Sequence, residues 1–90
     1  MRFKFDVSKS RRLRQQRGVG FEEVQEIFYM PYYLDALAGE PEQWVAIGWV
    51  TGRLYTVVYE ERTDEEGPYY HLVTLWRSTS AERKLYDESQ

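Results

Sequence analysis

The sequence predicts a small α+β domain, and three observations lead to that class. Residues 44–50 and 54–59 are rich in β-branched and aromatic side chains and are separated by a glycine-containing turn, which is typical of a β-hairpin. A third run of this kind, 69–76, follows an acidic, turn-rich stretch. Helix-capping residues precede the segments on either side of these runs. We therefore expect an antiparallel three-strand meander with helices before and after it.

The first residues predict a short strand and a polar helix. Residues 2–5 alternate polar and apolar side chains, which places both phenylalanines toward the core of a strand. Asp6 is a typical N-cap, because its carboxylate can accept from free amides of the next turn. Gly18 is a typical C-terminal glycine. A first helix is therefore expected up to about Gln16.

A second helix is expected to begin after Gly20. Two acidic residues stand in its first turn, and Glu23 can reach back to the free amide at its start. Met30 and Pro31 are expected to end it. Its apolar residues fall on one stripe, which predicts a core-facing side. The members of this stripe are Phe21, Val24, Ile27 and Phe28.

The rest of the chain predicts loops, the meander and a last helix. Residues 32–43 contain a glycine and a proline but no clear period, so we expect a connection with at most one turn of helix. Thr51, Gly52 and Arg53 are expected to form a three-residue hairpin connection, and 60–68 the exposed tip of the next hairpin. Thr79 and Glu82 have capping-box spacing. A final helix is expected from about Ser80, anchored by Ala81, Leu85 and Tyr86.

Length and composition limit the class of protein. Ninety residues are enough for one hydrophobic core, so a single domain over residues 1–90 is expected. The chain has no cysteine and one histidine, His71, so we expect neither disulfides nor a metal site, and no cofactor. No apolar run approaches the roughly 20 residues of a membrane helix. A cytoplasmic protein is expected.

The net charge of −3 is unevenly distributed. Residues 1–17 contain seven basic residues and one acidic residue, whereas the remaining 73 contain five basic and fourteen acidic residues. A basic segment on an acidic body suits contacts with nucleic-acid phosphates. The alternative is a solvated helix face.

Residues spread over nearly the whole chain resemble the BrnT family. The early part matches the pattern [FW]-D-x-x-K, then K-H-G-V-x-F-E-E, then V-F-x-D-P, and later positions match the family's strands and last helix. The matching residues are Phe5, Asp6, Lys9, Gly18, Val19, Phe21, Glu22, Glu23, Phe28, Pro31, Ile47, Gly48, Gly52, Arg53, Val57, Val58, Tyr59, Arg62, Thr79, Glu82, Arg83 and Tyr86. Each motif is weak alone, but their order and spacing are specific together.

This resemblance implies a fold, an activity and a partner. It implies a RelE-like fold and the toxin half of a type II toxin–antitoxin pair. BrnT proteins are ribonucleases that inhibit translation. A ribbon-helix-helix antitoxin, BrnA, neutralises them and represses the shared operon. The expected partners are therefore a BrnA-like antitoxin and RNA, without a membrane, in a homodimer or a heterotetramer with the antitoxin.

The sequence departs from the family at several polar positions. The family's asparagine in the first helix is Leu13, and its K-H-G becomes Gln16, Arg17 and Gly18. Its E-R before the first long strand becomes Glu42 and Gln43, and the arginine of its I-S-A-R becomes Trp76. These substitutions favour an alternative, a catalytically degenerate relative that acts as a protein- or RNA-binding module.

Metal-independent RNA cleavage needs a base for the 2′-hydroxyl, an acid for the leaving oxygen and cations at the phosphorus. A mechanism with two histidines is excluded, since His71 is alone. RelE-like toxins resemble one another in using Lys, Arg and Tyr. The catalytic candidates are Lys9 by family match, Arg17 in place of the family's histidine, Arg62, and His71 in place of a common arginine. The RNA-binding candidates are Arg11, Arg12, Arg14, Arg77 and Tyr86.

Each candidate also has a structural interpretation. Lys9 can be a solvated helix residue, and Arg17 can serve the helix C-terminus. Arg62 lies among acidic residues and can relieve their repulsion. A histidine between aromatic residues of a strand, as His71 is, more often has a structural role. Trp76 can stack on a base or pack inside the protein.

Overall fold

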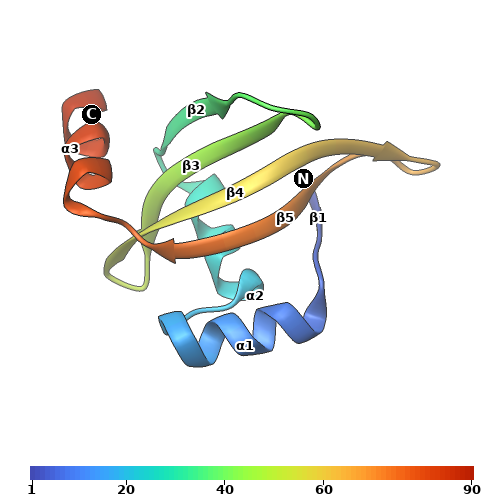
Figure 1. The fold of residues 1–90 in the computed structure, drawn as a ribbon, viewed down its shortest axis with the longest axis horizontal. Coiled ribbons are helices and arrows are strands. Elements are labelled where there is room, and N and C mark those ends of the chain that lie inside the picture. The colour runs from blue at the N-terminus through green and yellow to red at the C-terminus, as the bar shows by residue number, and fades with distance from the viewer.

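The computed structural model describes residues 1–90 and contains a five-stranded sheet with helices on both sides (Figure 1). The elements are β1 (Arg2–Lys4), α1 (Val7–Arg17), α2 (Phe21–Val24), the 3-10 helix η1 (Gln25–Tyr29), β2 (Tyr33–Leu37), β3 (Gln43–Val50), β4 (Arg53–Asp64), β5 (Gly67–Arg77) and α3 (Ser80–Ser89). The strand order is β1-β5-β4-β3-β2, with β1 parallel to β5 and all other pairs antiparallel. No helix combines the length and apolar character that a bilayer crossing requires.

The predicted α+β class is confirmed, but the predicted number of strands in the meander is wrong. The expected connection over 32–43 contains β2, which pairs with β3 from Tyr33 opposite Ile47 to Leu37 opposite Gln43. This strand lies at the edge of the sheet, and four of its five side chains are exposed. An edge strand with so little burial needs no alternation of polar and apolar residues. Its pairing with β3 therefore left no periodic signal in the sequence.

Both hairpin turns are tighter than predicted. Val50 pairs with Arg53, so only Thr51 and Gly52 connect β3 and β4. Their φ angles are 47° and 82°, as in a type I′ turn, which matches the twist of the strands. The three-residue connection was expected because Gly52 can take the positive φ that such a connection requires, whereas in the structure the β-branched Thr51 also has a positive φ. Likewise, the expected acidic tip over 60–68 is mostly paired, and only two residues join β4 to β5.

The predicted ends of the first helix are confirmed. The Asp6 carboxylate accepts from the backbone N–H of Lys9 at 2.9 Å, and Gly18 ends the helix at a φ of 94°. The helix is polar, and it buries only Ser10 and Leu13. Most of its basic side chains therefore remain at the surface.

The second helix begins as predicted but changes type after one turn. The Glu23 carboxylate accepts from the Gly20 backbone N–H at 2.7 Å, as expected. After α2 the chain continues as the 3-10 helix η1. Phe21, Val24 and Ile27 are fully buried and are spaced by three residues, which matches the three residues per turn of a 3-10 helix. The predicted apolar stripe is thus kept in a tighter helix.

The two faces of the sheet are covered unequally. We call the side packed against α1, α2 and η1 the helix-covered face, and the opposite side the open face (Figure 1). The helix-covered face holds the main core, in which Tyr55, Tyr59 and Phe21 are the largest buried side chains. On the open face, α3 covers one end through a smaller cluster of Ile47, Leu54 and Tyr86. Beyond this cluster, the open face carries apolar side chains such as Val45 and polar ones such as Glu60.

The last helix has the predicted cap but a different anchor. The Thr79 hydroxyl accepts from the Glu82 backbone N–H, and the Glu82 carboxylate accepts from the Thr79 backbone N–H at 2.8 Å. Of the three predicted anchors only Tyr86 is buried, because Ala81 and Leu85 are exposed. Tyr86 packs edge-on against Trp49, with ring centroids 6.2 Å apart. This contact turns the helix so that its neighbour Leu85 faces solvent.

Candidate functional site

Four polar side chains form a row across the open face. Lys4 on β1 pairs with His71 on β5, and His71 pairs with Glu60 on β4. The amide of Gln43 on β3 donates to Glu60 Oε2 at 2.9 Å and completes the row. Directly paired residues have Cβ atoms about 5 Å apart, so these side chains are neighbours. The row brings together groups that are up to 67 residues apart in the sequence.

Glu60 is a buried carboxylate that holds Arg62 in place. It is 6% exposed, and Arg62, two residues on and on the same face, donates from Nε to Glu60 Oε1 at 3.0 Å. The hydrogen bond from Gln43, followed by that from Arg62, lowers the pKa of Glu60. The carboxylate is therefore ionised at neutral pH and fixes the Arg62 guanidinium beside His71.

His71 is held in its neutral form by its surroundings. Burial lowers the pKa of the imidazole, and the charge of Arg62 lowers it further, while Glu60 acts in the opposite direction. A neutral imidazole can accept a proton at neutral pH, as a general base must. The position thus has the protonation state that base catalysis needs.

Lys9 lies on α1, near its N-terminal end. Helix α1 packs against β5, and the charge of Lys9 is among the causes that lower the pKa of His71. Arg17 is eight residues further along the same helix, about 12 Å along the axis at 1.5 Å per residue. Of the four catalytic candidates, the structure therefore places Arg62 and His71 together on neighbouring strands, and Lys9 and Arg17 on α1.

A second row lies next to the first, displaced along the strands toward the β4–β5 turn. Tyr69 pairs with Arg2 on one side and with Arg62 on the other. The Lys4 ammonium lies 4.5 Å from the centre of the Tyr69 ring. Asp64 accepts hydrogen bonds from Arg2 and Lys4, and these two bonds lower its pKa. The site is thus bordered by cations and by one ring.

The RNA-binding candidates are dispersed. Arg11 and Arg12 are exposed on α1. The Arg14 guanidinium is already hydrogen-bonded within the protein, because it donates to Glu23 at 2.9 Å and to Glu22 at 2.7 Å. Arg77 is exposed at the end of β5, beside the α3 end of the sheet.

Tyr86 is buried, and its hydroxyl donates to the Pro31 carbonyl at 3.4 Å. Arg14 and Tyr86 therefore have structural contacts that limit their availability.

Two of the substituted polar positions have structural roles. The Trp76 indole N–H donates to Glu82 at 2.9 Å, and Thr56 donates to the same carboxylate at 3.1 Å. Glu82 thus joins β4, β5 and the first turn of α3. Leu13 is buried in the main core. Both positions now stabilise the fold rather than border the polar row.

Sequence reasoning did not single out Glu60, Tyr69 or Lys4. Each lies on the open face through the alternation of a strand, and pairing the three strands in register would have placed them beside His71. The register of β4 and β5 has a bulge between Val58 and Tyr59. Without knowledge of that bulge, the faces of the two strands could not be matched.

One comparison with known proteins found a family. The family described as "Ribonuclease toxin, BrnT, of type II toxin-antitoxin system" matches residues 5–82. The matched range contains every member of the polar row except Lys4, and it includes Lys9 and Arg62. A search of curated proteins found no match.

Proposed function

The chain belongs to the BrnT family of ribonuclease toxins of type II toxin–antitoxin systems, and we propose that it cleaves RNA at His71 without a metal ion. The observation that carries this proposal is the position of His71, which pairs with Lys4 on β1 and with Glu60 on β4, beside Arg62. Lys9 and Arg62 both act on its pKa. We propose the cytoplasm as its place of action.

The proposed reaction is a transfer within the RNA chain. His71 accepts the proton of a 2′-hydroxyl, and the oxygen attacks the adjacent phosphorus. The bond from phosphorus to the 5′-oxygen breaks, and the Lys9 ammonium donates a proton to that leaving oxygen. Arg62 stabilises the charge that develops on the phosphoryl oxygens, as preorganised cations do in such sites. The products are a 2′,3′-cyclic phosphate and a free 5′-hydroxyl.

The alternative is a relative that binds RNA or protein without cleavage. The observation that favours it concerns Trp76, which stands where the family has an arginine. Its indole N–H donates a hydrogen bond to Glu82. Induced expression separates the two functions. Growth arrest with fragmented RNA, abolished by Lys9→Ala, supports the ribonuclease. Unaffected growth with intact RNA supports the binding module.

The pH dependence of cleavage follows from His71. Because burial and Arg62 lower its pKa below the ordinary value of 6.5, the base form persists as the pH falls through 6.5. The cleavage rate is therefore expected to be level around pH 7 and to fall only at a pH below 6.5. A single-turnover rate measured from pH 4.5 to pH 8 checks this. A rate that is already halved at pH 7 would contradict the assignment of His71.

We also propose that a ribbon-helix-helix antitoxin neutralises the chain. We call the exposed apolar side chains at the end of η1 and along the edge strand β2 the apolar strip; its two leucines lie on opposite faces of β2, and together the side chains give a partner a contact surface. Its members are Tyr29, Met30, Leu34 and Leu37, which are all exposed. The cognate antitoxin is expected to bind along this strip.

Leu34→Lys is expected to weaken antitoxin binding at least tenfold. The substitution places a charge in the apolar strip, and a charged edge strand disfavours pairing with another chain. Leu85→Lys is the matched control, since both leucines are 44% exposed and Leu85 lies on α3. Calorimetric titration of each variant with the antitoxin measures the difference. Equal affinities for the two variants would place the antitoxin elsewhere.

A further inference from the structure

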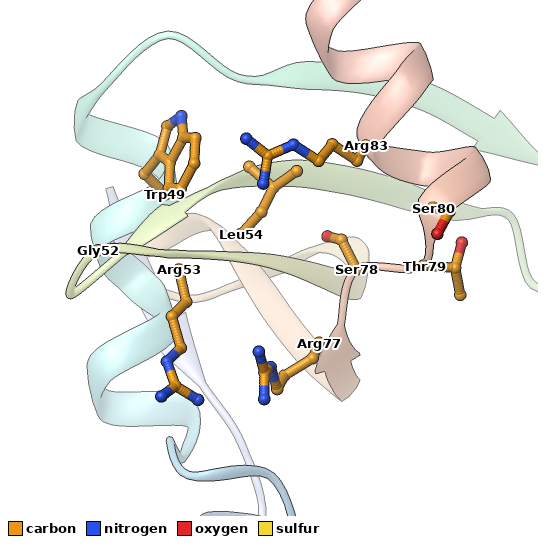
Figure 2. A pocket seen from close by; sticks show the side chains of 9 residues that line it. All are labelled: Trp49, Gly52, Arg53, Leu54, Arg77, Ser78, Thr79, Ser80 and Arg83. Carbon is orange, nitrogen blue, oxygen red and sulfur yellow. The ribbon is translucent and has the colours of Figure 1, made fainter.

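A basic hollow lies at the end of the sheet where the β3–β4 turn meets the start of α3 (Figure 2). Its volume is about 330 Å³. Three arginines, three hydroxyl residues and one tryptophan dominate its lining. They are Arg53, Arg77, Arg83, Ser78, Thr79, Ser80 and Trp49.

Arg53 and Arg77 in this hollow have no carboxylate partner, unlike several other arginines of the chain. Arg2, Arg14 and Arg62 each donate a hydrogen bond to a carboxylate. No carboxylate lines the hollow. The one ionic contact of its arginines joins Arg83 to Asp87 at 3.7 Å, between two exposed side chains. The hollow therefore concentrates uncompensated positive charge on a protein whose net charge is −3.

Strand pairing and helix position direct these side chains. Arg77 pairs with Tyr55, and Arg53 precedes Tyr55 by two residues on the same strand, so the two arginines are diagonal neighbours on one face. Figure 2 shows their guanidinium groups on the same side of β4. On the other side of β4, Arg83 extends from α3 toward Trp49, and its guanidinium carbon is 5.4 Å from the centre of the indole.

We propose that this hollow binds the phosphate backbone of single-stranded RNA. Arginine forks recognise phosphate in a bidentate manner. Hydroxyl side chains commonly donate to phosphate and sugar oxygens, and an aromatic ring provides a platform for a base. A flexible RNA strand that passes round the end of the sheet can bring phosphates to Arg53 and Arg77 on one side of β4 and a base to Trp49 on the other, whereas an acidic peptide would leave the ring without a matching group. The combination therefore favours a nucleic acid over a protein.

The hollow is separate from the polar row. Arg77 follows His71 by six residues on β5, which is about 20 Å of strand at 3.3 Å per residue. An RNA strand held in the hollow would thus be anchored at a distance from the proposed cleavage position. The inference rests on the proposed function, because it takes RNA as the ligand. It assigns Arg53 and Arg77 to binding rather than to chemistry.

The test measures RNA binding without cleavage. A fluorescent single-stranded 2′-O-methyl oligonucleotide lacks the attacking hydroxyl, and its anisotropy reports affinity for the full chain at several salt concentrations. The double variant Arg53→Ala, Arg77→Ala is expected to bind at least tenfold more weakly. Its salt dependence is expected to fall by about 0.7 in log–log slope for each phosphate that is no longer neutralised. Lys84→Ala, an exposed α3 residue outside the hollow, is expected to bind like the wild type.

The outcomes separate this inference from the proposed function. Wild-type binding that depends on Arg53 and Arg77, without cleavage of ordinary RNA, would support the hollow and reject the ribonuclease. Unchanged binding and salt slope in the double variant overturn the inference even if ordinary RNA is cleaved. Failure of the wild type to bind the oligonucleotide also overturns it. A double variant that is weakened only in its affinity for the antitoxin would assign the hollow to that partner instead.

Discussion

His71→Ala is expected to reduce the rate of RNA cleavage by about 10² to 10⁴, the contribution typical of general acid–base catalysis. Removing the imidazole leaves the 2′-hydroxyl without a proton acceptor. Arg62 remains in place, because its hydrogen bond goes to Glu60 and not to His71. The substrate affinity is therefore expected to change little. Single-turnover kinetics with a labelled single-stranded RNA measure the rate and the affinity separately.

A matched control separates chemistry from structure at this position. His71→Gln keeps a polar side chain of similar size but cannot take up a proton at neutral pH. It is expected to be as inactive as the alanine variant, with an unfolding free energy close to that of the wild type. Recovery of cleavage in the glutamine variant would show that the imidazole serves only as a spacer in the sheet.

Phe21→Ala is expected to lower the free energy of unfolding by about 3–5 kcal/mol, the usual cost of removing a buried phenylalanine. The ring is 0% exposed and packs against Phe5, with centroids 5.4 Å apart. Small domains are stable by only about 5–15 kcal/mol. The loss is therefore large enough to populate the unfolded state at 37 °C, and urea unfolding followed by circular dichroism measures it.

Tyr29→Ala provides the comparison for this prediction. Tyr29 lies in the same helical segment, at the end of η1, but its side chain is 68% exposed. Its replacement is expected to change the unfolding free energy by no more than about 0.5 kcal/mol, as is usual at the surface. Similar losses in both variants would mean that α2 and η1 do not pack as described.

Local signals predicted most of the fold. Caps and turns depend on residues close in sequence, so Asp6, Gly18 and the pair Thr79 and Glu82 could be interpreted correctly. The strand β2 could not be predicted, because the backbone of β3 determines it and its own side chains are mostly exposed. Tyr86 was expected as one of three anchors, but only its contact with Trp49 decides the rotation of α3.

The candidate site was predictable only in part. The resemblance pointed to Arg62 and His71, which the fold places on neighbouring strands, and to Lys9, which lies on α1. Glu60 was absent from that set, because its importance comes from burial and from its hydrogen bond with Gln43, a partner on another strand. The basic hollow was missed for the same reason. Arg53 was interpreted as a turn residue, and its proximity to Arg77 depends on the register of β4 and β5.

The central claim is tested most directly by the chemistry of the RNA ends. The purified chain is incubated with an internally labelled single-stranded RNA in the presence of EDTA, beside His71→Ala. We predict fragments with free 5′-hydroxyls and 2′,3′-cyclic phosphates for the wild type, and intact RNA for the variant. Intact RNA in both reactions, or cleavage that EDTA abolishes, would contradict a metal-independent ribonuclease built around His71.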